Sequence, residues 1–389
     1  MVRRKVSCTY ALFIILPIIF IVGCSNRYRG SISPTGMIAT PSSTDSKSFG
    51  SIIPTVAPTN KINQDELSAT LSYMSIETAS DLILVEEWNN ATAYDVAWSP
   101  DSRLFAMTLL EEDQYRVVVL EAESIKQLWE AGSPGPITDI EFSPDGRVLA
   151  VLHCCGHPLQ MFDTRSGEKV FEYSDKHYIC SPHGRELFFT PDSDYLYWTN
   201  SYGRSEDYRT GIYRMEMPDG NCEIYIEYIQ GWLDDLHFLK GGNLVITSMS
   251  HTSKYTREDW VYIWDAVGRS LLCQFKGLSP IASPKRNAFL LLPPDGNNMI
   301  IDGANCEVVK DVGPISEIIA IDKTENLILQ NDSSNLVIND FMSLDVVNRI
   351  PFPEIFIDLV ISPDWKKIII YSHLEVPVIQ LYYGQGINE

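Results

Sequence analysis

A short motif recurs along most of the chain, and this repetition constrains the fold more than any other feature of the sequence. Its clearest copies contain Ser-Pro-Asp, at 99–101, 143–145 and 362–364. Weaker copies are an apolar run before a polar turn, at 187–192, 235–242, 281–285 and 319–323. Successive copies lie 44, 47, 49, 44, 39 and 40 residues apart, measured between Ser99, Ser143, Thr190, Leu239, Ser283, Asp322 and Ser362. The chain is therefore predicted to stack seven similar units.

Each unit has the residues expected of several short strands. In the second unit, an alternating run over 138–142 leads into Ser-Pro-Asp-Gly, which is typical of a tight turn. A second run follows at 148–152, a third ends at Met161-Phe162-Asp163, and a fourth follows the glycine turn at 165–171. Because no helix-period segment of useful length follows residue 90, the pattern predicts antiparallel strands throughout.

These residues resemble the WD40-like propeller family, strongly in units 1, 2, 4 and 7 and by pattern in the others. The resemblance covers about residues 80–384 and implies an all-β, seven-bladed β-propeller, here assigned to residues 66–389. The last unit has room for only three strands, whereas residues 82–88 form an unpartnered apolar run. We therefore expect residues 82–88 to complete the blade that carries Ser362, which leaves no open sheet edge.

The N-terminus has the order of a secretory signal: Arg3, Arg4 and Lys5 precede an apolar run over 10–22. That run is too short for a membrane-spanning helix, which needs about 20 residues. It ends at Ile21-Val22-Gly23-Cys24, which resembles the bacterial lipobox. The resemblance implies that residues 1–23 are a signal peptide, removed before Cys24, and that Cys24 carries a diacylglyceryl anchor. An uncleaved membrane anchor and an ordinary secretory signal are the alternatives.

Residues 24–65 are rich in Ser, Thr and Pro and poor in aromatic residues. Such a segment cannot bury enough apolar surface to offset the entropy of ordering, so we predict a disordered, flexible linker. A tether of about 40 residues would hold the following domain roughly 35 Å from its anchor. An extracytoplasmic lipoprotein, anchored to the bacterial cell membrane through Cys24, is the expected localisation.

The charge of the chain limits its partners. Removal of residues 1–23 leaves 27 basic and 51 acidic residues, a formal charge of −24. An anionic surface disfavours nucleic acid, whose binding depends on positive side chains that release counterions. It equally disfavours adhesion to anionic lipid, so membrane attachment is assigned to the lipid anchor alone.

Histidines and cysteines gather in two predicted loops on one face of the propeller, at 153–157 and 177–183. Three interpretations stay open: a disulfide joining Cys180 to Cys155 or Cys154, free thiols beside solvated histidines, or a metal site. Candidate metal ligands are His153, Cys155, His157, Cys180 and His183.

An aspartate stands four residues before the turn marker in units 1, 2, 4 and 7. The propeller resemblance places these residues at the mouth of the central channel, where they either attract a cation or accept backbone hydrogen bonds. They are Asp95, Asp139, Asp235 and Asp358. The remaining cysteines, Cys222, Cys273 and Cys306, are scattered over separate units and are expected to be packing residues.

The sequence contains no nucleophile elbow, no phosphate-binding glycine loop and no His-Glu-x-x-His motif. We therefore expect no catalysis and no cofactor, and a propeller that presents a loop face to a protein, peptide or glycan. A metal-dependent, lactonase-like or lyase-like propeller enzyme is the alternative, using the aspartates or the His/Cys loops. A structural envelope component without a discrete ligand is the third hypothesis.

Overall fold

The computed structural model contains only β-strands among the regular elements of its described residues. No helix in this part of the chain is long and apolar enough to span a bilayer. The described residues are 2–3, 81–89, 92–111, 114–153, 159–173, 186–202, 209–217, 220–230, 232–239, 244–252, 257–265, 267–283, 287–293, 297–313, 318–321, 327–332, 335–351, 358–372 and 378–385.

Three sheets of four antiparallel strands come first along the chain. The first sheet contains β3 (Thr92–Trp98), β4 (Leu104–Glu111), β5 (Gln114–Glu121) and β6 (Gln127–Gly132). The second contains β7 (Ile137–Phe142), β8 (Val148–His153), β9 (Leu159–Asp163) and β10 (Lys169–Tyr173). The third contains β11 (Leu187–Phe189), β12 (Tyr195–Tyr202), β13 (Arg209–Glu216) and β14 (Cys222–Gln230).

Three further sheets follow with the same internal order of strands. The fourth contains β15 (Trp232–Leu239), β16 (Leu244–Thr252), β17 (Arg257–Asp265) and β18 (Ser270–Lys276). The fifth contains β19 (Leu278–Ser283), β20 (Ala288–Leu292), β21 (Asn298–Asp302) and β22 (Val308–Gly313). The sixth contains β23 (Ile318–Ile321), β24 (Leu327–Asp332), β25 (Asn335–Asp340) and β26 (Val346–Pro351).

The last sheet joins the two ends of this region of the chain. Strands β27 (Asp358–Ile361), β28 (Lys367–Ser372) and β29 (Val378–Gln385) are completed by β2 (Asp81–Asn89). β2 pairs antiparallel with β29, with Asp81 opposite Gln385 and Asn89 opposite Val378. The prediction that residues 82–88 complete this sheet is confirmed.

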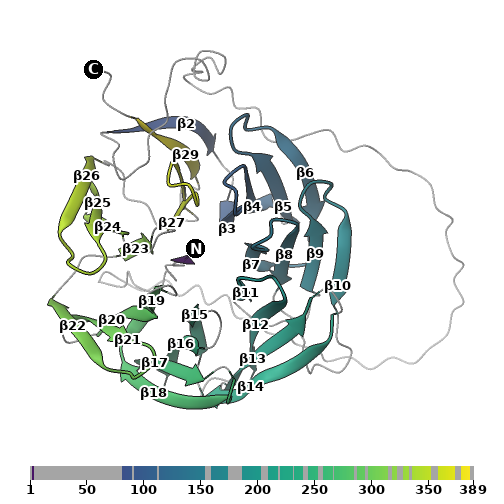
Figure 1. Cartoon of the computed structure of the whole chain (residues 1–389). Helices are drawn as coiled ribbons and strands as arrows, with labels where there is room; N and C mark the ends of the chain where they lie inside the picture. The colour runs from purple at the N-terminus through teal and green to yellow at the C-terminus, as the bar shows by residue number, and fades with distance from the viewer. Residues whose placement is uncertain are drawn as a thin grey trace, which may run out of the picture. The chain divides into compact units, whose positions relative to one another are not determined.

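The innermost strands close a ring. β3 contacts β7, β7 contacts β11, and β15 contacts β19; β19 contacts β23, β23 contacts β27, and β27 contacts β3. At the remaining junction, β12 and β13 contact β15. Figure 1 shows the sheets arranged radially with these strands innermost. The all-β propeller predicted from the repeats is therefore present.

The prediction of seven four-stranded blades is confirmed only in part, because the described residues form six. Six of the sheets have four strands, but the sheet of β23–β26 has a fifth, β1 (Val2–Arg3). β1 pairs antiparallel with the inner edge of β23, Val2 opposite Ile321 and Arg3 opposite Ala320. An unpaired inner edge offers backbone donors and acceptors, and two N-terminal residues occupy it here. The rest of the predicted signal peptide and the predicted linker lie outside the described residues.

The Ser-Pro-Asp motif closes the first hairpin of a sheet through local hydrogen bonds. Ser99 Oγ donates to Asp101 Oδ1 at 2.7 Å and accepts from the Leu104 amide at 2.9 Å. Ser102 then adopts a positive φ of 62°, which reverses the chain. The same hydroxyl–carboxylate bond recurs in three later turns: Ser143–Asp145, Thr190–Asp192 and Ser362–Asp364.

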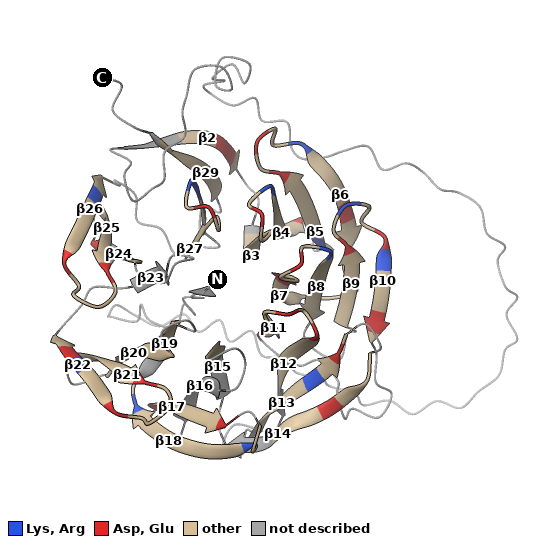
Figure 2. Cartoon of the chain, in the orientation of Figure 1, with Lys and Arg blue, Asp and Glu red and all other residues tan. Residues whose placement is uncertain are grey.

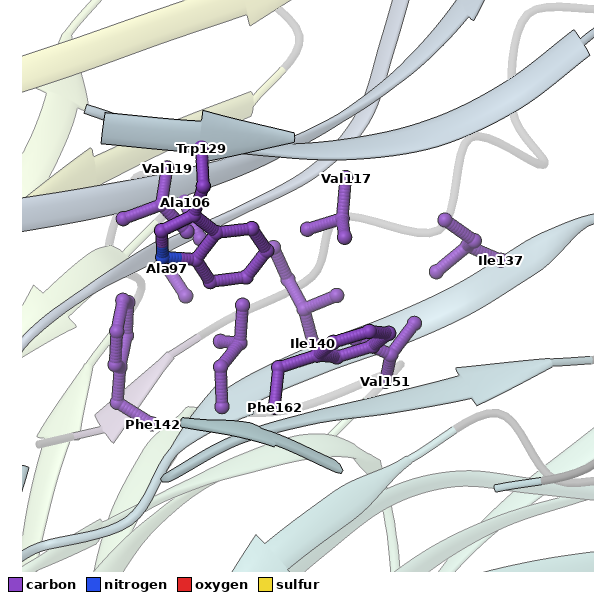
Figure 3. Close-up of a cluster of buried hydrophobic side chains, with 11 residues drawn as sticks. Ala97, Ala106, Val117, Val119, Trp129, Ile137, Ile140, Phe142, Val151 and Phe162 are labelled. Carbon is purple, nitrogen blue, oxygen red and sulfur yellow. The ribbon is translucent and has the colours of Figure 1, made fainter. Parts of the chain in front are cut away.

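The hydrophobic core lies between neighbouring sheets. Between the first two sheets, small side chains of β3 and β4 (Ala97 and Ala106) make room for Trp129, Ile140 and Phe162. Figure 3 shows these side chains meeting between the sheets. The rings of Trp129 and Phe162 lie 5.7 Å apart between centroids. Alternating strand residues thus give each sheet two apolar faces, one for each neighbour.

Candidate functional site

The two predicted channel aspartates that can be described join neighbouring sheets. Asp95 is 1% exposed; its Oδ1 accepts from the Val96 amide and its Oδ2 accepts from the Ile140 amide of the next sheet, at 2.9 and 2.8 Å. Asp139, 2% exposed, accepts through Oδ2 from the Leu187 amide of the third sheet at 2.5 Å. These contacts favour the structural interpretation of both residues over a cation ring.

A bulge in the inner strand directs Asp95 toward the next sheet. Ala93 pairs with Leu109 and Val96 pairs with Met107, so Tyr94 and Asp95 together face Thr108. The Asp95 amide donates to Thr108 Oγ1 at 2.9 Å, which satisfies the backbone at the bulge. Asp95 therefore lies within β3 and does not begin the strand.

The other two aspartates are placed only by their backbones. Asp235 lies inside β15, after a bulge between Leu233 and Asp235, and Asp358 is the first residue of β27. Their side chains lie outside what the structure describes.

Of the predicted metal ligands, only His153 is described. It is the last residue of β8 and is fully buried. Hydrogen bonds from Lys169 and Gln160 lower the pKa of the Glu172 carboxyl, and the charge interaction with His153 adds a smaller effect in the same direction. Cys155, His157, Cys180 and His183, and with them the predicted Cys155–Cys180 disulfide, lie outside the described residues. Within the described residues, no three His, Cys, Asp or Glu side chains are grouped to hold a metal ion.

Cys273 and Cys306 form a disulfide, with their Cα atoms 6.4 Å apart. The expectation that these residues only pack was wrong. Cys273 lies on β18, the outer strand of one sheet, and Cys306 lies in the β21–β22 turn of the next. Cys222 is also disulfide-bonded, and its partner lies outside the described residues.

The disulfide occupies a position that recurs at other sheet junctions. Cys273 and Trp129 each stand four residues after the positive-φ residue of the turn before their strand. Trp129 Nε1 donates to the Thr164 carbonyl at 2.8 Å, and a Cβ on Gly167 would lie 2.6 Å from the Trp129 ring. Gly167 corresponds in its turn to Cys306. One junction is thus packed by a tryptophan over a glycine, and another is covalent.

The junction between the third and fourth sheets uses charge and aromatic rings instead. The Arg214 guanidinium lies 4.6 Å from the Tyr195 ring centre and 4.9 Å from that of Tyr225. Arg269, in the turn of the fourth sheet, hydrogen-bonds Glu223 at 3.1 Å. Burial opposes ionisation of Glu223, but hydrogen bonds from Arg269 and Arg214 outweigh it and lower the pKa of its carboxyl. Burial raises the pKa of Tyr225. The charged groups of this cluster are therefore paired with one another and with the aromatic rings.

One exposed aromatic residue marks the edge at which the first inner strand begins. Thr92 pairs with Leu110, and Arg116 pairs with Gly132, so the start of β3 and the end of β6 share this edge. We call it the entry edge. Near it, Tyr94 is 43% exposed and its ring lies 6.1 Å from that of Tyr115. A half-exposed aromatic ring held by a second ring is typical of protein-binding surfaces.

Comparison with known families agrees with this geometry. Residues 88–182, about a quarter of the chain, match the family model of the anaphase-promoting complex subunit 4 WD40 domain. The match spans the first two sheets and their connections. The chain therefore contains a β-propeller with a WD40-like region. No curated protein matches the chain.

Sequence reasoning missed the Cys273–Cys306 bond, although a signal for it exists. When the turns are aligned on the acidic residue that begins them, Cys306 falls where Gly167 and Gly220 stand. Cys273 then falls where Trp129 and Phe171 stand, four residues after the matching position of its own turn. Aligning these turns would have placed the two cysteines at one junction.

Proposed function

We propose that the chain is a lipid-anchored, extracytoplasmic β-propeller that binds a protein or peptide ligand at the entry edge and performs no catalysis. The closed ring of sheets, together with the WD40-like match over residues 88–182, carries this proposal, because WD40 propellers generally serve as protein-interaction scaffolds. Tyr94 is the exposed side chain at this edge that would contact the partner.

The proposed location is supported by the disulfide chemistry. The Cys273–Cys306 bond, which does not depend on the lipobox, is of a kind that persists in oxidising compartments outside the cytoplasm. Cleavage before Cys24 would also remove β1, which would leave four strands, β23 to β26, in that sheet.

Affinity capture from envelope extract tests the binding proposal. The mature chain, the Tyr94→Ala variant and the matched Val170→Ala variant would be used as baits; Val170 is 54% exposed on the outer strand β10. We expect a specific, saturable protein partner that Tyr94→Ala loses and Val170→Ala keeps. Capture of the same partner by the Tyr94→Ala variant, or reproducible absence of any partner, would contradict the proposal.

Intact mass spectrometry of the membrane-extracted chain tests the anchor. We expect a chain that begins at Cys24 and carries diacylglyceryl mass. A chain that retains residues 1–23, or a cleaved chain without lipid, would refute the lipid anchor.

A further inference from the structure

The outer strands of three consecutive sheets expose pairs of aliphatic side chains at equivalent positions. We call these residues the apolar rim: Leu271 and Leu272 of β18, Val308 and Val309 of β22, and Val346 and Val347 of β26. Each side chain is between 43% and 54% exposed. Figure 1 shows β18, β22 and β26 one after another on the outside of the ring.

The position of each pair is fixed by the turn before it. The pairs begin two residues after a positive-φ residue, which is Arg269, Cys306 and Leu344 respectively. In each pair the second residue is a β-bulge; Ile300 pairs with Lys310 and Ile301 with Val308, so Val309 is the extra residue. The three pairs therefore lie at the same end of their sheets.

The bulge accounts for only one apolar residue of each pair. The bulged residue is also apolar in the first two sheets, where Leu128 and Val170 occupy it. The residue before it is polar there, Gln127 and Lys169, which is the usual composition of an exposed edge strand. Two exposed aliphatic residues together occur on the fourth, fifth and sixth sheets, and these sheets adjoin one another through β15, β19 and β23. Exposed apolar pairs that recur on three adjacent sheets are unusual on an edge strand and indicate an interaction surface.

The chain enters the propeller beside this rim. β2 contacts β26, so the sheet that begins with Asp81 neighbours the sheet of Val346 and Val347. Asp81 pairs with Gln385 at the end of β29, which corresponds to the end at which the other outer strands begin. Asp81 lies 57 residues after Cys24. If the segment between them is flexible, as its composition predicts, it would span about 40 Å. An acyl anchor on Cys24 would hold this edge near the bilayer.

The charges around the rim are of both signs. Glu307, Asp311 and Asp345 lie on or beside the same outer strands, and so do Arg269, Lys310 and Arg349. Figure 2 shows both acidic and basic positions on the turns and outer strands around the ring. Because neither sign prevails there, contact with a bilayer would come from the aliphatic side chains.

We propose that the apolar rim lies against the surface of the bilayer that holds the Cys24 anchor, an inference that rests on the proposed lipid anchoring. Because the anchor keeps the rim at a high effective concentration next to the membrane, six partly exposed aliphatic side chains are enough for a persistent contact. The contact orients the propeller, with one rim on the membrane and the entry edge free for a ligand.

Photo-crosslinking in vesicles tests this orientation. The acylated chain is reconstituted in phosphatidylcholine vesicles containing a lipid with a photoreactive group near its headgroup, and cross-linked peptides are mapped by mass spectrometry. We expect adducts at the starts of β18, β22 and β26, and at least fivefold fewer at Val170 of β10. In the variant Leu271→Ser/Val308→Ser/Val346→Ser the rim adducts should fall to the Val170 level, whereas the matched Val170→Ser variant should keep them.

The outcomes separate the two proposals. If the acylated chain gives adducts spread evenly, or none at the rim, the proposed rim contact is wrong and the proposed lipid anchor is unaffected. If the purified chain carries no lipid, the anchor fails; the rim contact is then judged by the same adducts at excess lipid, where a rim level no higher than that of Val170 overturns it as well. Equal thermal unfolding of all variants shows that the substitutions leave the fold intact.

Discussion

The carboxylate of Asp95 receives two backbone N–H groups, one from its own strand and one from Ile140 of the next sheet. Such contacts matter because the sheets share no backbone ladder with each other. Neighbouring sheets are joined by apolar side chains and by a few polar groups at fixed positions. At the residue scale, each of these groups can be removed and the consequence measured.

Replacement of Asp95 by alanine should destabilise the propeller. It leaves the Ile140 amide buried without its acceptor, which costs about 1–3 kcal/mol in the free energy of unfolding. Asp95→Asn keeps one acceptor oxygen and should lose less. Asp332→Ala, whose side chain is 51% exposed, is the control and should change stability by less than about 1 kcal/mol. Urea unfolding measures all three; an Asp95→Ala variant as stable as the control would refute this role.

Gly167 and Gly313 allow backbone strain to be separated from packing. Both have a positive φ, of 70° and 71°, but an added Cβ would meet the Trp129 ring only at Gly167. Gly313→Ala should cost about 1 kcal/mol through backbone strain alone. Gly167→Ala should cost a further ~1–3 kcal/mol because Trp129 must move. Equal thermal destabilisation by the two substitutions would show that the Trp129 contact contributes nothing.

Asp364 should make stability depend on pH. Burial opposes ionisation of this carboxyl, but the hydrogen bond from Ser362 Oγ and the charge of Lys367 outweigh it and lower its pKa below the ordinary 3.8. A lowered folded-state pKa contributes stability above the unfolded-state value, and this is lost as pH falls through the folded-state value. Asp364→Asn should therefore be less stable than the wild type at pH 7, and the difference should shrink below about pH 4. A difference that stays constant from pH 7 to pH 3 would contradict this account.

At the scale of strands and turns, the chain varies one device from junction to junction. The residue that stands four positions after the positive-φ residue of one turn lies on the outer strand and meets the turn of the next sheet. Trp129 and Phe171 pack on glycines, Cys273 forms a disulfide, and Lys310 donates to the Met342 carbonyl at 2.6 Å. The position of the contacting residue is the same at each of these junctions although the kind of contact differs, so the turn geometry is the constant feature of the repeat.

The disulfide should be the strongest single junction. It closes a loop between residues separated by 33 positions, for which about 3–4 kcal/mol of stabilisation is expected. Cys273→Ser, Cys306→Ser and the double variant should therefore lose the same stability, because each removes the same bond. Denaturant unfolding of the three variants measures this. Clearly additive losses in the double variant would contradict a shared bond.

The strands could be predicted where the determining interactions are local. The Ser-Pro-Asp turns are held by bonds between residues no more than five apart, and the run at 148–152 agrees with β8. The closing strand β2 was predictable because the last unit lacked a strand. The burial of Asp95 and the Cys273–Cys306 bond depend on contacts between different repeats, and counting within one repeat could not predict them. Of the predicted His/Cys cluster only His153 is described, so the cluster itself stays a prediction.

At the scale of the whole propeller, closure joins distant parts of the chain into one ring. β2 pairs with β29, Tyr383 Oη donates to the Ala122 carbonyl at 2.7 Å, and the Asp364 amide donates to Ser102 Oγ at 2.9 Å. These bonds connect the last sheet to the first. A closed ring leaves its two faces and its rim as the surfaces available for partners, and we assign the entry edge to a protein ligand and the apolar rim to the bilayer.

Site-specific cross-linking in the native envelope tests the central proposal, that the propeller is a binding module, most directly. A photoreactive amino acid would replace Tyr94 in one variant and Val170 in a matched one. The account predicts a discrete adduct with another protein at position 94 and none at position 170. No adduct at position 94, or the same adducts at both positions, would contradict it.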